Sequence, residues 1–228
     1  MSEEIPVTEN WNATTICTDI NQGARSGVLK ANARARQAAT GRIRMRVTGR
    51  RTVFEGRFFR IVEKVIDSGK GENLAWETVE RTNVHGSGAV VIIALTKDGD
   101  LLFEKNWRAP IESSVIQFPA GLTDVQAESE GDAARRELLE ETGYAATELI
   151  PVFLSPLCAA VTSTRAMHFF APGVEFVGRT GSQETKGIEV IRVPADEADE
   201  FMLNLPEGVE LDLRVPGILW LLRKKGLI

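Results

Sequence analysis

Apolar residues follow a strand-like pattern over most of the chain from Thr52 onward. Alternating or short continuous apolar runs, separated by turn sequences such as Asp67-Ser-Gly-Lys-Gly and Thr96-Lys-Asp-Gly, are typical of β-strands. Short polar turns join the first four runs, so these four predict an antiparallel sheet. The predicted strands cover residues 54–66, 74–82, 88–95, 100–104, 115–118, 149–154, 167–171 and 188–193.

Helical patterns are fewer and come later. Residues 132–142 predict a helix that Gly143 ends as a left-handed cap, and residues 195–203 and 213–225 predict two more, the last beginning after Asp212. Strands, one central helix, further strands and terminal helices indicate an α+β protein whose mixed sheet is sandwiched between helices.

Residues 1–51 show neither the periodicity of strands nor that of helices, apart from an Ala/Arg-rich patch that could form a short helix. We interpret these residues as an arm. Residues 1–24 carry −4 and residues 25–51 carry +9, so the remainder carries −5 + 4 − 9 = −10. An acidic body suits a metal site and disfavours nucleic acid as a partner. The arm is expected to be a solvated extension; a tether or a targeting segment is the alternative, although the acidic first residues do not suit a transit peptide.

The composition is that of a globular protein, with 43% hydrophobic residues among 228. No window approaches the ~18 consecutive apolar residues of a membrane span, and the first residues lack the features of a secretory signal. We therefore expect a cytoplasmic protein with no membrane partner. Cys17 and Cys158, the two cysteines, are expected to be reduced thiols.

Three glutamates of the central helix carry the strongest chemical signal. Glu137, Glu140 and Glu141 stand at i, i+3 and i+4, and ~100° per residue places them along one stripe. Carboxylates this close repel one another unless cations lie among them. With no His or Cys nearby, this oxygen-rich set favours Mg²⁺, or Mn²⁺, over zinc. The alternative is a solvated acidic helix face, supported by Arg136 four residues before Glu140.

Neighbouring residues extend these glutamates to a motif. From Gly121 through Glu128 and Arg136 to Tyr144 the chain reads G-x6-E-x7-R-E-U-x-E-E-x-G-U, where U is apolar. This pattern resembles the Nudix box, which usually has five residues, not six, between the first Gly and the Glu. The additional residue falls in the loop before the helix and leaves the helix unchanged.

Within this superfamily, five further segments are most similar to the ADP-ribose/ADP-sugar pyrophosphatases. They are Glu55-Gly-Arg-Phe-Phe-Arg-Ile, Trp76-Glu-Thr-Val-Glu-Arg-Thr, Asn106-Trp-Arg-Ala-Pro, Ile116-Gln-Phe-Pro-Ala-Gly-Leu and Ile188-Glu-Val-Ile-Arg-Val-Pro. The resemblance implies a Nudix fold with an N-terminal antiparallel sheet, usually exchanged in a homodimer. It also implies Mg²⁺-dependent cleavage of ADP-ribose to AMP and ribose 5-phosphate. We divide the chain accordingly into the arm, 1–51, and a Nudix domain with its dimerisation sheet, 52–228.

The resemblance assigns roles residue by residue. The implied metal ligands are Glu137, Glu140, Glu141 and the carbonyl of Ala120, with Arg136 as the orienting arginine. The implied substrate-binding residues are Trp76 and Phe58 on the adenine, Arg81 and Arg108 on the diphosphate and ribose, and Glu77 and Leu122. Aromatic faces suit a nucleobase and guanidinium groups suit a diphosphate, although Trp76 could be a plain sheet residue and Arg108 a surface ion pair.

The general base is assigned less uniquely. Relatives often use a glutamate before the last strand, and Glu184 and Glu189 flank that position, which one gapless alignment gives to Lys186. Glu140 or a metal hydroxide could serve instead. Gln117 stands where many relatives have Glu, which removes one charge beside the substrate.

Two other functions stay open on the sequence: hydrolysis of a GDP- or UDP-sugar, and a non-catalytic module that binds a nucleotide. The histidines offer no rival site, because His85 and His168 lie far apart without a partner Ser or Cys, and we expect His168 to be a satisfied strand residue.

Overall fold

The computed structural model describes residues 45–69, 71–178 and 187–228. The arm before residue 45, with its predicted short helix and Cys17, and the candidate base Glu184 lie outside these residues. The described residues divide into two compact units, one with those of 45–48 and 66–74 and the other with those of 49–65 and 75–228. In the first unit, Arg46 pairs with Asp67 at 3.0 Å. The predicted site residues that the structure describes belong to the second unit.

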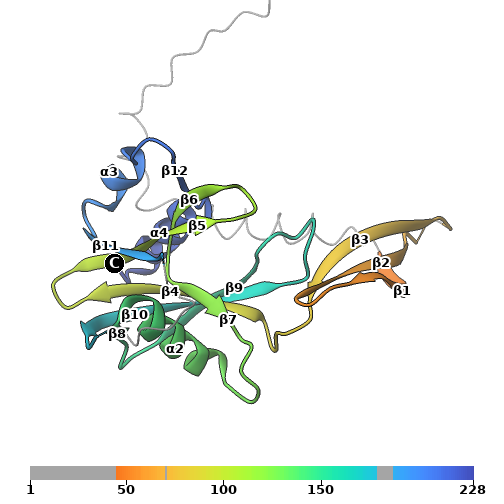
Figure 1. Ribbon diagram of the computed structural model, residues 1–228, viewed down its shortest axis with the longest axis horizontal. Helices are drawn as coiled ribbons and strands as arrows, with labels where there is room; N and C mark the ends of the chain where they lie inside the picture. Colours follow the sequence, from red (N-terminus) through yellow and green to blue (C-terminus); the bar gives the residue numbers. More distant parts are fainter. Residues whose placement is uncertain (1–44, 70, 179–186) are drawn as a thin grey trace, which may run out of the picture. The chain divides into compact units, whose positions relative to one another are not determined.

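Two sheets organise the described residues (Figure 1). The first is the N-terminal antiparallel sheet, in the order β1 (Arg46–Glu55), β2 (Phe59–Asp67), β3 (Asn73–Arg81). The second follows the order β12 (Val209–Leu211), β6 (Ser113–Gln117), β5 (Asp100–Arg108), β4 (Gly88–Thr96), β10 (Arg165–Phe176), β8 (Tyr144–Ala145). It also contains β7 (Ala120–Leu122) on β4, β9 (Ile150–Pro156) on β10, and β11 (Glu189–Pro194) on β5. Because β10 is parallel to β4 and β5 antiparallel to it, the sheet is mixed.

Helices cover both faces of the second sheet. On one face, Val90, Ile92 and Leu102 pack with Ala134 and Leu138 of α2 (Glu130–Thr142). On the other, the alternate residues pack against α3 (Ala198–Leu203) and α4 (Arg214–Lys225). Figure 1 shows α2 beside β4, β7 and β10. The period of two along β4 therefore places a helix on each side, and the predicted α+β sandwich is confirmed.

Several expected elements differ in extent or pairing. The expected strand over residues 54–66 is two strands, β1 and β2, because the chain turns back at Gly56, whose N–H donates to the carbonyl of Phe59 at 2.7 Å. β1 begins at Arg46, six residues before Thr52, because pairing with β2, not periodicity, makes it a strand. The antiparallel sheet expected from four consecutive strands was wrong: the strand at 88–95 is β4 of the other sheet, where it pairs with the distant β10.

No described helix is long and apolar enough to cross a membrane. Cys158 is an exposed free thiol, as expected for that residue.

Candidate active site

Helix α2 presents the acidic motif. Its N-terminus is capped by Ser129, whose hydroxyl accepts from Asp132 N at 3.1 Å, so the helix begins two residues before the predicted start. Gly143, with φ 78°, ends it as the predicted left-handed cap. Between these caps, Glu137, Glu140 and Glu141 share one stripe, as helical periodicity requires.

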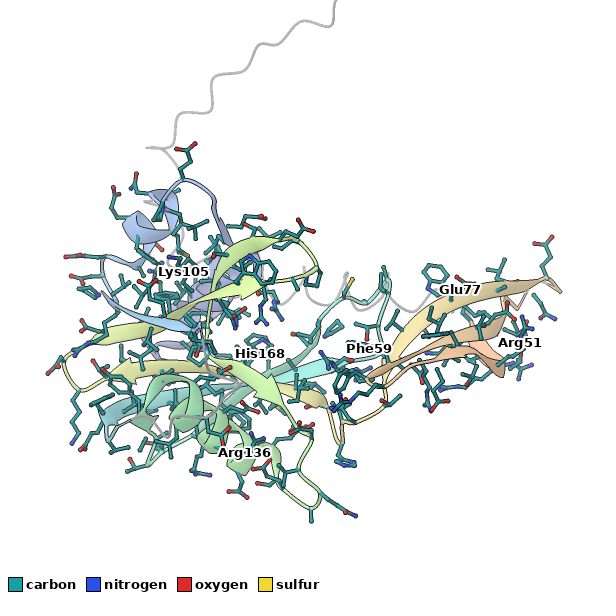
Figure 2. All side chains as sticks on the ribbon, viewed as in Figure 1. Arg51, Phe59, Glu77, Lys105, Arg136 and His168 are labelled. Atoms are coloured by element: carbon teal, nitrogen blue, oxygen red, sulfur yellow. The ribbon has the colours of Figure 1, made fainter. Side chains whose placement is uncertain are left out.

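Arg136, labelled in Figure 2, makes hydrogen bonds to several other residues of the motif. Its guanidinium donates to both carboxylate oxygens of Glu128 at 3.0 and 3.1 Å, a bidentate pair. It also donates to Glu137 at 2.8 Å and to Glu140 at 3.4 Å. These carboxylates raise the pKa of Arg136, Glu128 first, so its charge is permanent. Arg136 therefore contacts two of the three glutamates, including Glu140, four residues away along the helix.

The turn before the helix approaches the glutamates through its backbone. Ala120 N donates to Glu141 Oε2 at 3.0 Å, and the carbonyl of Leu122 accepts from Arg136 at 3.1 Å. Between them, a Cβ added at Gly121 would lie 1.9 Å from the Cδ of Glu137. Only glycine permits this approach of β7 to α2, which is a steric reason for the first Gly of the motif.

A cleft of about 320 Å³ opens above this turn and carries most of the predicted residues. It is lined by Phe58, Arg81, Asn83, Ala120, Gly121, Leu122, Asp124, Glu137, Glu140 and Glu141. Residues from four separate parts of the chain thus meet at one opening, with an aromatic ring and a guanidinium facing a group of carboxylates.

Burial and mutual repulsion disfavour the charged forms of the glutamates at this site. Burial raises the pKa of Glu137, against the opposing charge of Arg136. Burial and then the charge of Glu104 raise the pKa of Glu141, and burial also raises the pKa of Glu104. Each shift means that the site disfavours its own negative charges.

This donor set fits a hard divalent cation, which would neutralise these carboxylates. The fit concerns the type of donor and not a preformed cage: no three His, Cys, Asp or Glu side chains in the described ranges already surround one point suited to a metal ion. Arg136 supplies the cationic contacts of Glu137 and Glu140 in this arrangement, and Ala120 N the contact of Glu141.

Five of the predicted residues that the structure describes do not line the cleft. Trp76 is about half exposed, and its indole N–H donates to the carbonyl of Ala160 at 3.1 Å. Glu77 is exposed on β3. Arg108 donates from Nε to Gln117 at 3.1 Å and lines a separate small cavity beside Asp212 and Arg214. The last two are Arg136, which donates to Glu137 and Glu140, and Glu189, which pairs with Lys105 at 3.1 Å.

Sequence reasoning missed three residues near this site. Asn83 and Asp124 line the cleft, and Asp124 lies 3.6 Å from Arg136. The third, Glu104, is fully buried beside Glu141. A signal for it existed in the sequence, because Glu104 is an acid in phase with the apolar Leu102 of the same strand.

Comparison with known proteins supports the family indicated by the motif. The NUDIX domain matches residues 85–211. The chain is 37% identical over 100 residues to the ADP-ribose pyrophosphatase of Bacillus subtilis (strain 168), a match covering 40% of this chain and 54% of that protein, so it spans about half of that relative. It is 28% identical over 155 residues to the methanol dehydrogenase activator of Bacillus methanolicus, covering 66% of this chain and 78% of that protein.

A solved structure establishes the same fold. The crystal structure of an ADP compounds hydrolase has a TM-score of 0.65 and 21% identity, over 81% of this chain and 97% of that one. The matched NUDIX domain contains the whole of β4 to β12 and covers more than half of the 228 residues. Inside that domain the glutamates and Gly121 line one cleft and Arg136 binds two of those glutamates, and this chain belongs to the Nudix hydrolase family.

Proposed function

We propose that this chain hydrolyses the diphosphate of ADP-ribose or a related ADP-sugar to AMP and a sugar phosphate, with Mg²⁺ or, alternatively, Mn²⁺. The observation that carries the proposal is the cleft that joins the carboxylates of α2 with Arg81 and Phe58. The similarity to proteins named ADP-ribose pyrophosphatase supports this substrate class.

Each lining group has a task in this reaction. Arg81 offers the diphosphate a guanidinium group, and burial lowers its pKa without removing its charge. Phe58 offers a nearly half-exposed ring on which a base can stack. Arg136 holds Glu137 and Glu140 in position. A divalent cation bound by Glu137, Glu140 and Glu141 would neutralise the diphosphate and lower the pKa of the attacking water.

We propose Glu140 as the general base. Of the two candidate glutamates that the structure describes, Glu140 lines the cleft and is about one-third exposed, whereas Glu189 pairs with Lys105. We therefore expect Glu140→Gln to change the pH profile of kcat and Glu189→Gln to leave it unchanged.

We also infer a homodimer that pairs through the N-terminal sheet. Within residues 49–65 and 75–81, this sheet exposes large apolar side chains, and a small sheet is stable only when such a face is covered. These side chains are Val53, Phe54, Phe59 and Trp76 of the strands, with Phe58 in the turn between β1 and β2. Light scattering should give twice the mass of the chain.

The decisive experiment is a panel of nucleoside-diphosphate sugars with Mg²⁺, with products resolved by chromatography. AMP from ADP-ribose is expected, EDTA should stop the reaction, and added Mg²⁺ should restore it. Glu137→Gln or Glu141→Gln should lower turnover roughly a hundredfold or more. Glu175→Gln, an exposed partner of Lys97 outside the cleft, is the control. Preferred GDP- or UDP-sugar cleavage would correct the substrate, and binding without hydrolysis would indicate a non-catalytic module.

A further inference from the structure

Glu104 is an acidic side chain that the proposed reaction has not yet used. It lies near the centre of β5, where Leu102 and Glu104 point to the same face because strand side chains alternate. Leu102 packs in the cluster that contains Ala134 and Leu138 of α2. Glu104 therefore faces the same helix one strand period further along, next to the end of α2 that carries Glu141.

Burial makes this placement costly. Glu104 is 0% exposed, and neither of its carboxylate oxygens has a hydrogen-bond partner among the described residues. A buried carboxylate without a donor or a cation is among the least favourable groups in a protein interior. A side chain of this kind requires something to compensate it.

The neighbouring side chains compensate only in part: the charge of Arg108 and the side chain of Gln117 oppose the effect of burial on the pKa of Glu104, which nevertheless stays raised. Gln117 stands directly opposite Glu104 on β6, but its amide oxygen accepts from Arg108 and its amide nitrogen has no hydrogen-bond partner in the described structure. Arg108, the nearby cation, is thus held by Gln117 and not by Glu104. Glu141 is close enough to oppose the charge of Glu104, and Glu137 adds to the same repulsion.

We propose that Glu104 is a further ligand of the divalent cation, binding it together with Glu141 from the sheet side of the cleft. Three observations support this assignment: the two unpartnered oxygens of a fully buried carboxylate, the adjacent Glu141, and the strand alternation that places Glu104 on the face of β5 that packs against α2. Hard oxygen donors of this type are those that Mg²⁺ and Mn²⁺ bind. The proposal also relates to Gln117, which stands where many relatives have Glu. The negative charge that Gln117 lacks is present on Glu104, directly opposite it on β5.

This inference rests on the proposed function, since both require a cation at Glu137, Glu140 and Glu141. Its competitor is a purely structural role, in which Glu104 fills space as a neutral acid beside Glu141. The two roles predict different affinities for the cation when Glu104 is substituted. Substitution of a metal ligand weakens cation binding, whereas substitution of a neutral acid that only fills space leaves it unchanged.

The test is calorimetric titration of the full chain with Mn²⁺ alone, without substrate, at constant pH. Glu104→Gln keeps the shape of the side chain and removes its charge, and we expect Mn²⁺ binding to weaken by about 10- to 100-fold. Glu104→Met, an apolar side chain of similar length, should weaken it equally and serves if the Gln variant does not fold. Glu175→Gln should bind Mn²⁺ like the wild type. Circular dichroism checks the fold of each variant.

The outcomes separate the two proposals. Wild-type affinity in Glu104→Gln and Glu104→Met would overturn the assignment of Glu104 while leaving the metal site and the proposed function intact. A wild-type chain that does not bind Mn²⁺ would overturn both. Weakened binding in both Glu104 variants, with normal binding in Glu175→Gln, supports Glu104 as a ligand.

Discussion

Gly121→Ala tests whether the close approach of β7 to Glu137 is required for activity. The new Cβ would lie 1.9 Å from Glu137 Cδ, and real Cβ atoms essentially never approach other heavy atoms within 3.0 Å. Either the carboxylate or β7 must therefore shift by at least 3.0 − 1.9 = 1.1 Å. Gly121 is not among the glycines with positive φ, so the effect of alanine is steric and not conformational.

A displacement of this size is large for a catalytic group. Misplacement by about 1 Å can cost about 100-fold in rate, or about 2.7 kcal/mol of transition-state stabilisation. We expect kcat/KM for ADP-ribose to fall by about this factor, and Mn²⁺ binding measured by calorimetry to weaken. The variant should still fold, because a shift of the Glu137 side chain relieves the clash.

Two comparisons make the result specific. Gly131→Ala is the same substitution on the helix that carries Glu137, but its Cβ would make ordinary contacts with Arg135 Nη1 at 3.7 Å and Ser129 Oγ at 3.8 Å, so activity should be retained. Adding Gly121→Ala to Glu137→Gln should cost little beyond Glu137→Gln itself, because both act on one carboxylate. Wild-type kcat/KM in folded Gly121→Ala, or fully additive losses in the double variant, would refute the reasoning.

Three other predictions address the rest of the chain. Trp76→Ala should weaken substrate binding by about 1 to 3 kcal/mol with a smaller effect on kcat; an unchanged KM would make Trp76 a sheet residue held by Ala160. Burial lowers the pKa of His168 to about 4 from 6.5, so stability is lost as pH falls between these values, by at most about 3 kcal/mol. Denaturant unfolding at pH 7 and 4.5 should show a smaller loss for His168→Gln, and an equal loss would exclude His168 as the cause. A chain starting at Met45 keeps all of β1, and we expect it to fold, dimerise and hydrolyse ADP-ribose at a similar rate; a monomeric or inactive product would contradict the arm's assignment as an addition.

The sequence by itself determined the local features of this protein. Glu137, Glu140 and Glu141 share a stripe because helical geometry depends on spacing alone, and Gly143 ends the helix because its backbone adopts φ 78°. The continuous apolar run at residues 88–95 likewise predicted a strand, and β4 is buried on both faces. Resemblance added the interpretation of Arg136 and Ala120, which stand at fixed places in the motif.

Tertiary structure decided which distant residues meet. The sequence pattern did not assign β4 to the sheet of β10, did not reveal that Gly121 touches Glu137, and did not bring Glu104 to Glu141. It also left Arg108 as a candidate for the cleft, whereas Arg108 binds Gln117 beside another cavity. Local periodicity specifies the face on which a side chain lies, but contact between residues far apart in the chain depends on strand order and register. Those are set by the packing of the whole core, which no short stretch of sequence contains.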